Sequence, residues 1–170
     1  SGMLAAVESA GRQWEEAASA ADGFQGPAAW SELRSVVVAG MGGSAIAGDL
    51  AAAYLSGRWP VRIGVVRDYR LPEWADRSSL FIASSYSGGT EETLSLWEEA
   101  GRRQMPRAAV TTGGVLAREA EGAGVPVLPL PEGYQPRAAL PSSLVTLLTL
   151  LGSVGPEGPR APGGEETLHE

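Results

Sequence analysis

A short apolar run that leads directly into a turn of glycines and hydroxyl side chains occurs twice in this chain, and this repeat limits the possible folds more than any other feature. Ser35–Ala39 runs into residues 40–44, and residues 79–83 run into residues 84–93. Each apolar run has the length of a buried strand, and a helical pattern follows each turn. A strand, a tight turn and a helix in succession predict a parallel sheet that is covered by helices.

The rest of the chain extends this alternation. The sequence predicts an N-terminal helix over residues 3–21 and a short helix that begins at Pro27. The predicted strands span residues 35–39, 61–66, 79–83, 107–111 and 125–130, and the further helices span residues 44–56, 90–103, 115–123 and 140–151. The expected fold class is α/β, a flavodoxin-like three-layer α/β/α sandwich around a five-stranded parallel sheet in the order 2-1-3-4-5.

Length and composition indicate the domain organisation. With 170 residues and 44% hydrophobic content, the chain is expected to form one globular domain over residues 3–152. Residues 1–2 look like the remnant of an expression tag, and residues 153–170, rich in glycine, proline and glutamate, are expected to form a linker or a disordered tail. No apolar run reaches the roughly 18 residues that a membrane span needs, so we expect a cytoplasmic protein with no membrane partner.

Charge and cysteine content exclude several function classes. The net charge of −7 and the pI of about 4.8 argue against a nucleic-acid partner, because binding to a phosphate backbone is driven by cationic surface. The lack of cysteine excludes disulfides, thiol catalysis and thiolate metal sites. All 13 basic residues are arginine, which excludes Schiff-base chemistry and a phosphate-binding lysine of the Walker type. We expect neither a metal nor a cofactor.

The turns after the first and third predicted strands favour an anion site. In the expected strand order these strands are neighbours, and their turns open into one crevice at the carboxyl ends. Hydroxyl donors, free backbone N–H groups and two helix N-termini would together attract a phosphate-sized anion. A simpler interpretation of the second turn is a helix cap made by Thr90, with Glu91 and Glu92 placed where the helix dipole favours them.

A dinucleotide site is a competing interpretation of the first turn. Residues 40–45 match the G-x-G-x-x-A fingerprint, and Asp68 follows the second strand as the acid that would bind the ribose. This motif alone is weak, and it leaves the hydroxyl-rich turn at residues 85–87 unexplained.

Three motifs together resemble a known family. Residues 40–48, 84–93 and 135–139 look like the motifs of the bifunctional phosphoglucose/phosphomannose isomerases, members of the sugar isomerase (SIS) domain superfamily, and the chain resembles their N-terminal domain. The resemblance implies aldose–ketose isomerisation of hexose 6-phosphates through an enediolate. It also implies that Arg137 is the catalytic cation, and that Gly43 and the hydroxyl residues hold the substrate phosphate; these residues are Ser44, Ser85, Ser87 and Thr90.

The chain departs from that family in two respects. Gly89 stands where the family usually has asparagine, and the family enzymes carry a second such domain with a glutamate base and a histidine that assists ring opening. The histidine of this chain, His169, lies in the predicted tail, where nothing matches those motifs. We therefore expect the chain to bind hexose 6-phosphate and to interconvert it slowly on its own. The alternative function is a phosphosugar-sensing module without catalysis.

The predicted helix over residues 140–151 is apolar all round. Its leucines are not confined to one face, so a helix that covers only one side of a sheet would leave several of them in water. This pattern indicates a second body against which the helix packs, either an identical subunit in a homodimer or a second SIS domain. The alternative is a helix that is wholly enclosed within this domain.

Overall fold

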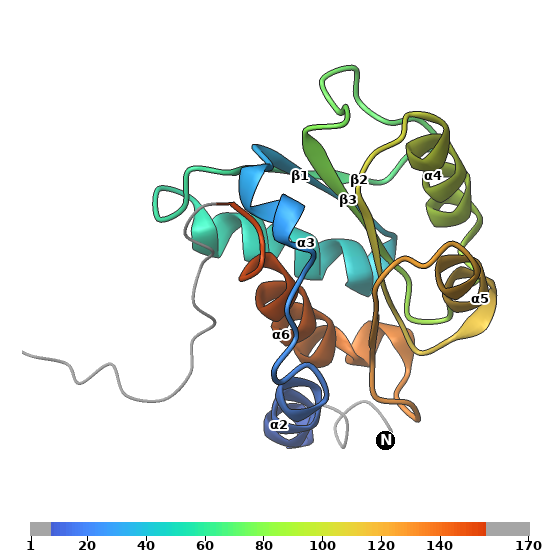
Figure 1. Cartoon of the computed structure of the whole chain (residues 1–170). Coiled ribbons are helices and arrows are strands. Elements are labelled where there is room, and N and C mark those ends of the chain that lie inside the picture. The colour runs from blue at the N-terminus through green and yellow to red at the C-terminus, as the bar shows by residue number, and fades with distance from the viewer. Residues whose placement is uncertain (1–7, 156–170) are drawn as a thin grey trace, which may run out of the picture.

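A five-stranded, all-parallel sheet lies between two layers of helices in the computed structural model, which describes residues 8–155 (Figure 1). The strand order is β2-β1-β3-β4-β5, and this confirms the predicted fold class and order. The strands are β1 (Ser35–Ala39), β2 (Arg62–Val66), β3 (Ser79–Ser84), β4 (Arg107–Thr111) and β5 (Val127–Pro129). The chain order reverses between β1 and β3, which is the switch point where α/β sheets bind ligands.

Successive residues of the central strands serve two separate cores. Val36 and Val38 point into the core beneath α3 and α6, whereas Val37 and Phe81 point into the core beneath α4 and α5. Both β1 and β3 are buried along their whole length. A strand with helices on both faces must be apolar at every position, which explains why these strands show no alternation in the sequence.

The helices follow the predicted order with small changes at their ends. They are α2 (Ala10–Ala20), α3 (Gly42–Leu55), α4 (Glu91–Arg102), α5 (Gly114–Gly122) and α6 (Leu140–Leu151), and two short 3-10 helices are η1 (Ala28–Glu32) and η2 (Pro136–Ala138). Residues 3–7 of the predicted N-terminal helix lie outside the described residues. Strand β5 is shorter than predicted because the Val125 N–H closes the end of α5 by donating to the Ala120 carbonyl (2.8 Å).

The C-terminal half of helix α6 is enclosed within the domain, as the alternative to a second body requires, whereas Leu140 and Leu144 near its N-terminus are only half-buried. It lies between the sheet, α3 and α2, and its C-terminal leucines, Leu147, Leu148, Leu150 and Leu151, are at most 3% exposed. Helix α2 folds back over the outer side of α6, where the Ser142 hydroxyl donates to Gln13 Oε1 (3.3 Å). A chain segment from the other end of the sequence therefore supplies the second surface that the leucine pattern required.

The packed part of the chain continues past the predicted domain boundary at residue 152. Val154 is fully buried in the core that contains α6, and the Gly155 N–H donates to the Trp30 carbonyl (2.9 Å). The Ser153 hydroxyl accepts a hydrogen bond from the Gly26 N–H (3.1 Å). The rest of the predicted tail, His169 included, lies outside the described residues. None of the helices within residues 8–155 has the length and apolarity to cross a membrane.

Candidate functional site

The turns that follow β1 and β3 lie side by side at the carboxyl edge of the sheet. Ala39 and Ala83 pair in the ladder just before the two turns. A Cβ atom on Gly40 would lie 2.8 Å from the Ser84 carbonyl oxygen and 3.2 Å from Ser44 Cβ. Glycine is therefore required at residue 40, because any side chain would force the two turns apart.

The third sequence motif joins this edge through the first turn of α3. A Cβ atom on Gly43 would lie 2.9 Å from the Pro136 carbonyl oxygen and 3.6 Å from Arg137 Cα. The η2 segment thus packs directly against the start of α3, where Ser44 is 7% exposed. The tertiary structure consequently brings together three motifs that are separated by about half the chain.

A hydrogen bond between two hydroxyl groups closes the turn after β3. Ser85 Oγ and Thr90 Oγ1 are 2.8 Å apart, and the Ser87 hydroxyl accepts the Gly89 N–H (3.3 Å) on the exposed side of the turn. Thr90 is the N-cap residue of α4, yet its side chain makes no capping hydrogen bond. The interpretation of Thr90 as a side-chain cap is therefore wrong, since its hydroxyl points toward Ser85.

The turn after β4 holds the turn after β3 in place. Gly88 has a left-handed backbone (φ +64°), and a Cβ atom on it would lie 1.8 Å from the Gly113 carbonyl oxygen. Thr112 donates to the Tyr86 carbonyl through both its N–H (3.1 Å) and its hydroxyl (2.7 Å). The hydroxyl-rich turn therefore has a fixed shape that glycine at residue 88 makes possible.

Tyr86 is a structural residue of the site that the sequence analysis did not identify. Its hydroxyl donates to the Pro131 carbonyl (2.9 Å) and accepts the Tyr134 N–H (3.0 Å). These bonds anchor the loop that leads into η2 and Arg137. The signal in the sequence was a lone aromatic residue among small ones, but its partners lie 45 and 48 residues away and could not be read from local pattern.

Within the described part of the chain, Arg137 is an unpaired cation on η2, the segment that packs against the start of α3. Its side chain is exposed, and its Nε donates to Gln135 Oε1 (3.3 Å). Among residues 8–155 no carboxylate forms an ion pair with it. Among the described residues, no ion pair neutralises the positive charge of this guanidinium. Arg137 lies where η2 meets α3.

The connection after β2 reaches the same edge of the sheet. Burial raises the pKa of Tyr69 above its ordinary value, and so do the negative charges of Glu91 and Glu92 and a hydrogen bond with Glu92. The Tyr69 side chain is about half exposed, and the carboxylates of Glu91 and Glu92 lie near its phenol. Tyr69 consequently lies over the first turn of α4, directly after Thr90.

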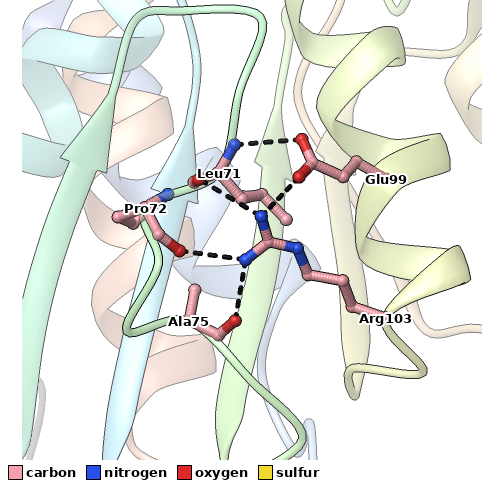
Figure 2. A network of polar contacts seen from close by, with 5 residues as sticks. All are labelled: Leu71, Pro72, Ala75, Glu99 and Arg103. Atoms are coloured by element: carbon pink, nitrogen blue, oxygen red, sulfur yellow. Dashed lines mark hydrogen bonds and ion pairs between the residues drawn. The ribbon is translucent and has the colours of Figure 1, made fainter.

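Hydrogen bonds from Arg103 and Glu99, at the C-terminal end of α4, hold the connection after β2 in place (Figure 2). Arg103 donates to the carbonyls of Pro72 (3.0 Å), Ala75 (3.0 Å) and Leu71 (3.3 Å), and it pairs with Glu99 (2.5 Å). Glu99 in turn accepts the Leu71 N–H (3.0 Å). The planar guanidinium can serve several acceptors at once, which suits it to holding an irregular loop.

The acid of the competing dinucleotide interpretation already has a local partner. The Asp68 carboxylate, which would bind a ribose, accepts the N–H of the next residue, Tyr69 (2.6 Å). Within the described part of the chain no group of three or more His, Cys, Asp or Glu side chains is arranged to hold a metal ion. The edge does offer neutral hydroxyls, two helix N-termini and a nearby arginine on η2, a set that suits an anion.

Comparison with curated proteins identifies several relatives. The chain is 45% identical over 117 residues to the bifunctional phosphoglucose/phosphomannose isomerase of Caldicellulosiruptor bescii, a match that covers 69% of this chain and 34% of the relative. It is 46% identical over 112 residues to the enzyme of the same name from Pyrobaculum calidifontis (65% and 35%). It is also 36% identical over 105 residues to the D-glucosamine-6-phosphate 4-epimerase of Sulfolobus acidocaldarius (60% and 32%). The chain thus spans about a third of the length of these relatives.

Solved structures share the fold at lower sequence identity. The NanR protein of Vibrio vulnificus complexed with ManNAc-6P matches with a TM-score of 0.67 at 18% identity, over 88% of this chain and 60% of that one. The tagatose-6-phosphate ketose/aldose isomerase of Escherichia coli matches with a TM-score of 0.63 at 20% identity (92% and 48%). No protein-family model matches the chain. The fold and the identity to the curated relatives lead to one conclusion: the chain is a sugar isomerase (SIS) domain that belongs to the bifunctional phosphoglucose/phosphomannose isomerase family.

Proposed function

We propose that the edge formed by the turns after β1 and β3 binds the phosphate group of a hexose 6-phosphate. The observation that carries the proposal is the convergence of the α3 and α4 N-termini with the hydrogen-bonded hydroxyls of Ser85 and Thr90. Helix N-termini present unpaired N–H groups to an anion, and hydroxyl groups can turn to donate. In this assignment Gly43, Ser44, Ser85, Ser87 and Thr90 hold the phosphate.

Arg137 would act at the sugar rather than at the phosphate. Interconversion of an aldose and a ketose requires a base to move a proton between neighbouring carbons, and the enediolate that forms needs a nearby positive charge. Arg137 lies on η2, beside the first turn of α3, and no ion pair within residues 8–155 competes for its charge. Phosphate binding at the turns would fix the substrate so that its reacting carbons face this guanidinium.

The activity proposed for the whole protein is aldose–ketose isomerisation of glucose 6-phosphate and mannose 6-phosphate, as the names of the curated relatives suggest. Glu91 and Glu92, the carboxylates nearest the turns, lie on the first turn of α4 beside Tyr69. Neither is placed across from Arg137 by any contact among the described residues. We therefore expect the 170-residue chain to bind the substrate and to turn it over far below the enzyme median of about 10 per second.

Calorimetric titration tests the binding proposal. Glucose 6-phosphate and inorganic phosphate should both bind, the sugar phosphate more tightly, whereas glucose and NAD should not bind. Binding of glucose with the same affinity as glucose 6-phosphate would contradict the phosphate assignment. Tight binding of NAD would restore the dinucleotide interpretation of the first turn.

Two other functions share the phosphate site and differ in chemistry. The relative named D-glucosamine-6-phosphate 4-epimerase favours a reaction at C4. A phosphosugar-sensing module without catalysis is the second alternative, and the NanR protein complexed with ManNAc-6P shares the fold of this chain. A coupled assay for fructose 6-phosphate, run on the full-length gene product, separates them from isomerisation. Conversion of fructose 6-phosphate supports the isomerase, conversion of glucosamine 6-phosphate alone supports the epimerase, and binding without conversion of either supports a sensor.

A further inference from the structure

Three backbone N–H groups at the start of α4 have no acceptor within the helix. The first bond of α4 runs from the Leu94 N–H to the Thr90 carbonyl (3.0 Å), so the N–H groups of residues 91–93 are left unpaired by the helix itself. The Thr90 side chain does not cap them, because its hydroxyl is hydrogen-bonded to Ser85 Oγ (2.8 Å). These N–H groups are therefore among the donors that the proposed phosphate site would use.

Two carboxylates stand next to these N–H groups. Glu91 and Glu92 occupy the first turn of α4, immediately after Thr90. A carboxylate in the first turn of a helix is attracted to the same N–H groups and the same dipole that favour a bound anion. It also repels a phosphate that lies beside it. A site at this helix end therefore binds an anion better when its own carboxylates are held away from the ligand.

The Tyr69 phenol engages one of these two carboxylates. It donates a hydrogen bond to Glu92, which is half-buried, whereas Glu91 is exposed. Among residues 8–155 the Glu92 carboxylate accepts no hydrogen bond from the N–H groups of residues 91–93. The partner of Glu92 in this structure is thus a side chain from the connection after β2, and not the end of its own helix.

The backbone on both sides of Tyr69 is held in place. Before it, the Val66 carbonyl at the end of β2 accepts the Gly40 N–H (3.2 Å) from the turn after β1. After it, the Leu71 N–H donates to the Glu99 carboxylate of α4 (3.0 Å; Figure 2). The segment that carries Tyr69 is therefore tied both to the turn after β1 and to α4, and its phenol reaches the first turn of α4 from a fixed position.

We propose that Tyr69 is a positioning residue of the phosphate site: its phenol holds the Glu92 carboxylate away from the N–H groups at the start of α4. This role rests on the proposed function, because it matters only if an anion binds at this helix end. Without the phenol, the carboxylate can turn toward the helix end and compete with phosphate for the same donors. The phenol therefore raises the affinity of the site for any phosphate ligand, with or without a sugar.

Calorimetric titration of the full chain with inorganic phosphate and with glucose 6-phosphate tests this role. Tyr69→Phe removes only the hydroxyl group, and both affinities should fall by about three- to fivefold, the size of a solvent-exposed charge interaction. The matched control is Tyr54→Phe near the end of α3, whose side chain is exposed to a similar degree (39% against 47%) and which should bind both ligands like the wild type. An unchanged affinity of Tyr69→Phe for phosphate would overturn the proposal.

Removal of the Glu92 charge separates a positioning role from a structural one. Glu92→Gln should raise both affinities, and Tyr69→Phe should have no further effect in that background, because no carboxylate remains to compete for the N–H groups. Glu98→Gln, which removes the same charge farther along α4, should leave the effect of Tyr69→Phe unchanged. A loss of affinity that persists in the Glu92→Gln background would overturn the proposal, since Tyr69 would then act through the shape of its loop.

The two ligands distinguish this role from the proposed function. If the wild-type chain binds neither ligand, the phosphate site itself is wrong, and the role of Tyr69 is wrong with it. If the wild type binds both ligands and Tyr69→Phe weakens only the binding of glucose 6-phosphate, the phosphate site stands. In that case Tyr69 contacts the sugar, and its proposed action through Glu92 is wrong.

Discussion

Ser85 Oγ and Thr90 Oγ1 form a 2.8 Å hydrogen bond across the turn between β3 and α4. Both hydroxyls belong to the proposed phosphate site, and each is held in place by the other. Since the hydroxyl of Thr90 makes no helix cap, it can turn toward a ligand without loosening α4. The turn is thus shaped in advance, and a bound phosphate would exchange one hydrogen bond for stronger bonds to an anion.

Replacement of Thr90 by valine tests this site with little change of shape. Loss of a hydrogen bond to a charged group costs about 1.5 to 3 kcal/mol, so the affinity for glucose 6-phosphate should fall by about 10- to 100-fold. The melting temperature should fall by only about 2 to 4 °C, because the bond to Ser85 is lost but no capping bond is. Calorimetry on Thr90→Val and on the control Ser95→Ala, farther along α4, measures the difference. Equal affinities in both variants would remove Thr90 from the site.

Replacement of Gly88 by alanine should destabilise the fold. The residue has φ +64°, and the new Cβ atom would lie 1.8 Å from the Gly113 carbonyl oxygen, so the turns after β3 and β4 must separate. We expect a loss of about 3 kcal/mol or more in the free energy of unfolding, or about 6 to 12 °C in melting temperature. Gly89→Ala is the control, since no atom lies within 4 Å of its Cβ position. Similar melting temperatures for the two variants would contradict the described turn.

Replacement of Gly43 by alanine should move η2 without unfolding the domain. The added Cβ atom would lie 2.9 Å from the Pro136 carbonyl oxygen, and backbone must shift to relieve that contact. Because Arg137 is carried by η2, the affinity for glucose 6-phosphate should fall by about tenfold. The control Gly122→Ala, at the end of α5 where no atom lies within 4 Å of the added Cβ, should bind like the wild type. If Gly43→Ala also binds like the wild type, the contact between α3 and η2 does not matter for the ligand.

Replacement of Arg103 by methionine should loosen the connection after β2. The change removes three bonds to carbonyls and the pairing with Glu99, and we expect unfolding to become easier by about 1 to 3 kcal/mol. Arg103→Lys should not restore the stability, because an ammonium group cannot reproduce the planar fork. The matched control is Arg102→Met, whose exposed pair with Glu98 (3.7 Å) should be worth at most about 1 kcal/mol. Urea unfolding of the three variants provides the comparison.

The pKa of Tyr69 predicts a stability change at alkaline pH. Burial and the charges of Glu91 and Glu92 raise this pKa, so the folded state holds the phenol proton more tightly than the unfolded state does. The resulting stability is fully present below the ordinary tyrosine pKa of about 10, and it is lost as the pH rises through the raised folded pKa. Tyr69→Phe should therefore lose less stability than the wild type above about pH 10. Identical alkaline curves for wild type and Tyr69→Phe would contradict the contact with Glu92.

Much of this architecture could be predicted from local pattern. Apolar runs of strand length, the turns of glycine and hydroxyl residues, and the helices after them are encoded by neighbouring residues, and with the topology rules of α/β folds they led to the expected strand order. The three motifs also pointed to the family before any contact was known. Composition alone excluded thiol and lysine chemistry, because a chain without cysteine or lysine cannot perform it.

The tertiary structure decided which surfaces cover one another. The leucines of α6 predicted a helix that is buried on most sides. Only the tertiary structure identified α2, from the opposite end of the chain, as the element that covers it. The direction of the Thr90 hydroxyl and the bonds of Tyr86 to Pro131 and Tyr134 were likewise decided by residues distant in sequence. A local pattern fixes how much of an element must be buried, because each residue contributes its own transfer free energy. It does not fix the partner, since many surfaces of the right shape would serve equally well.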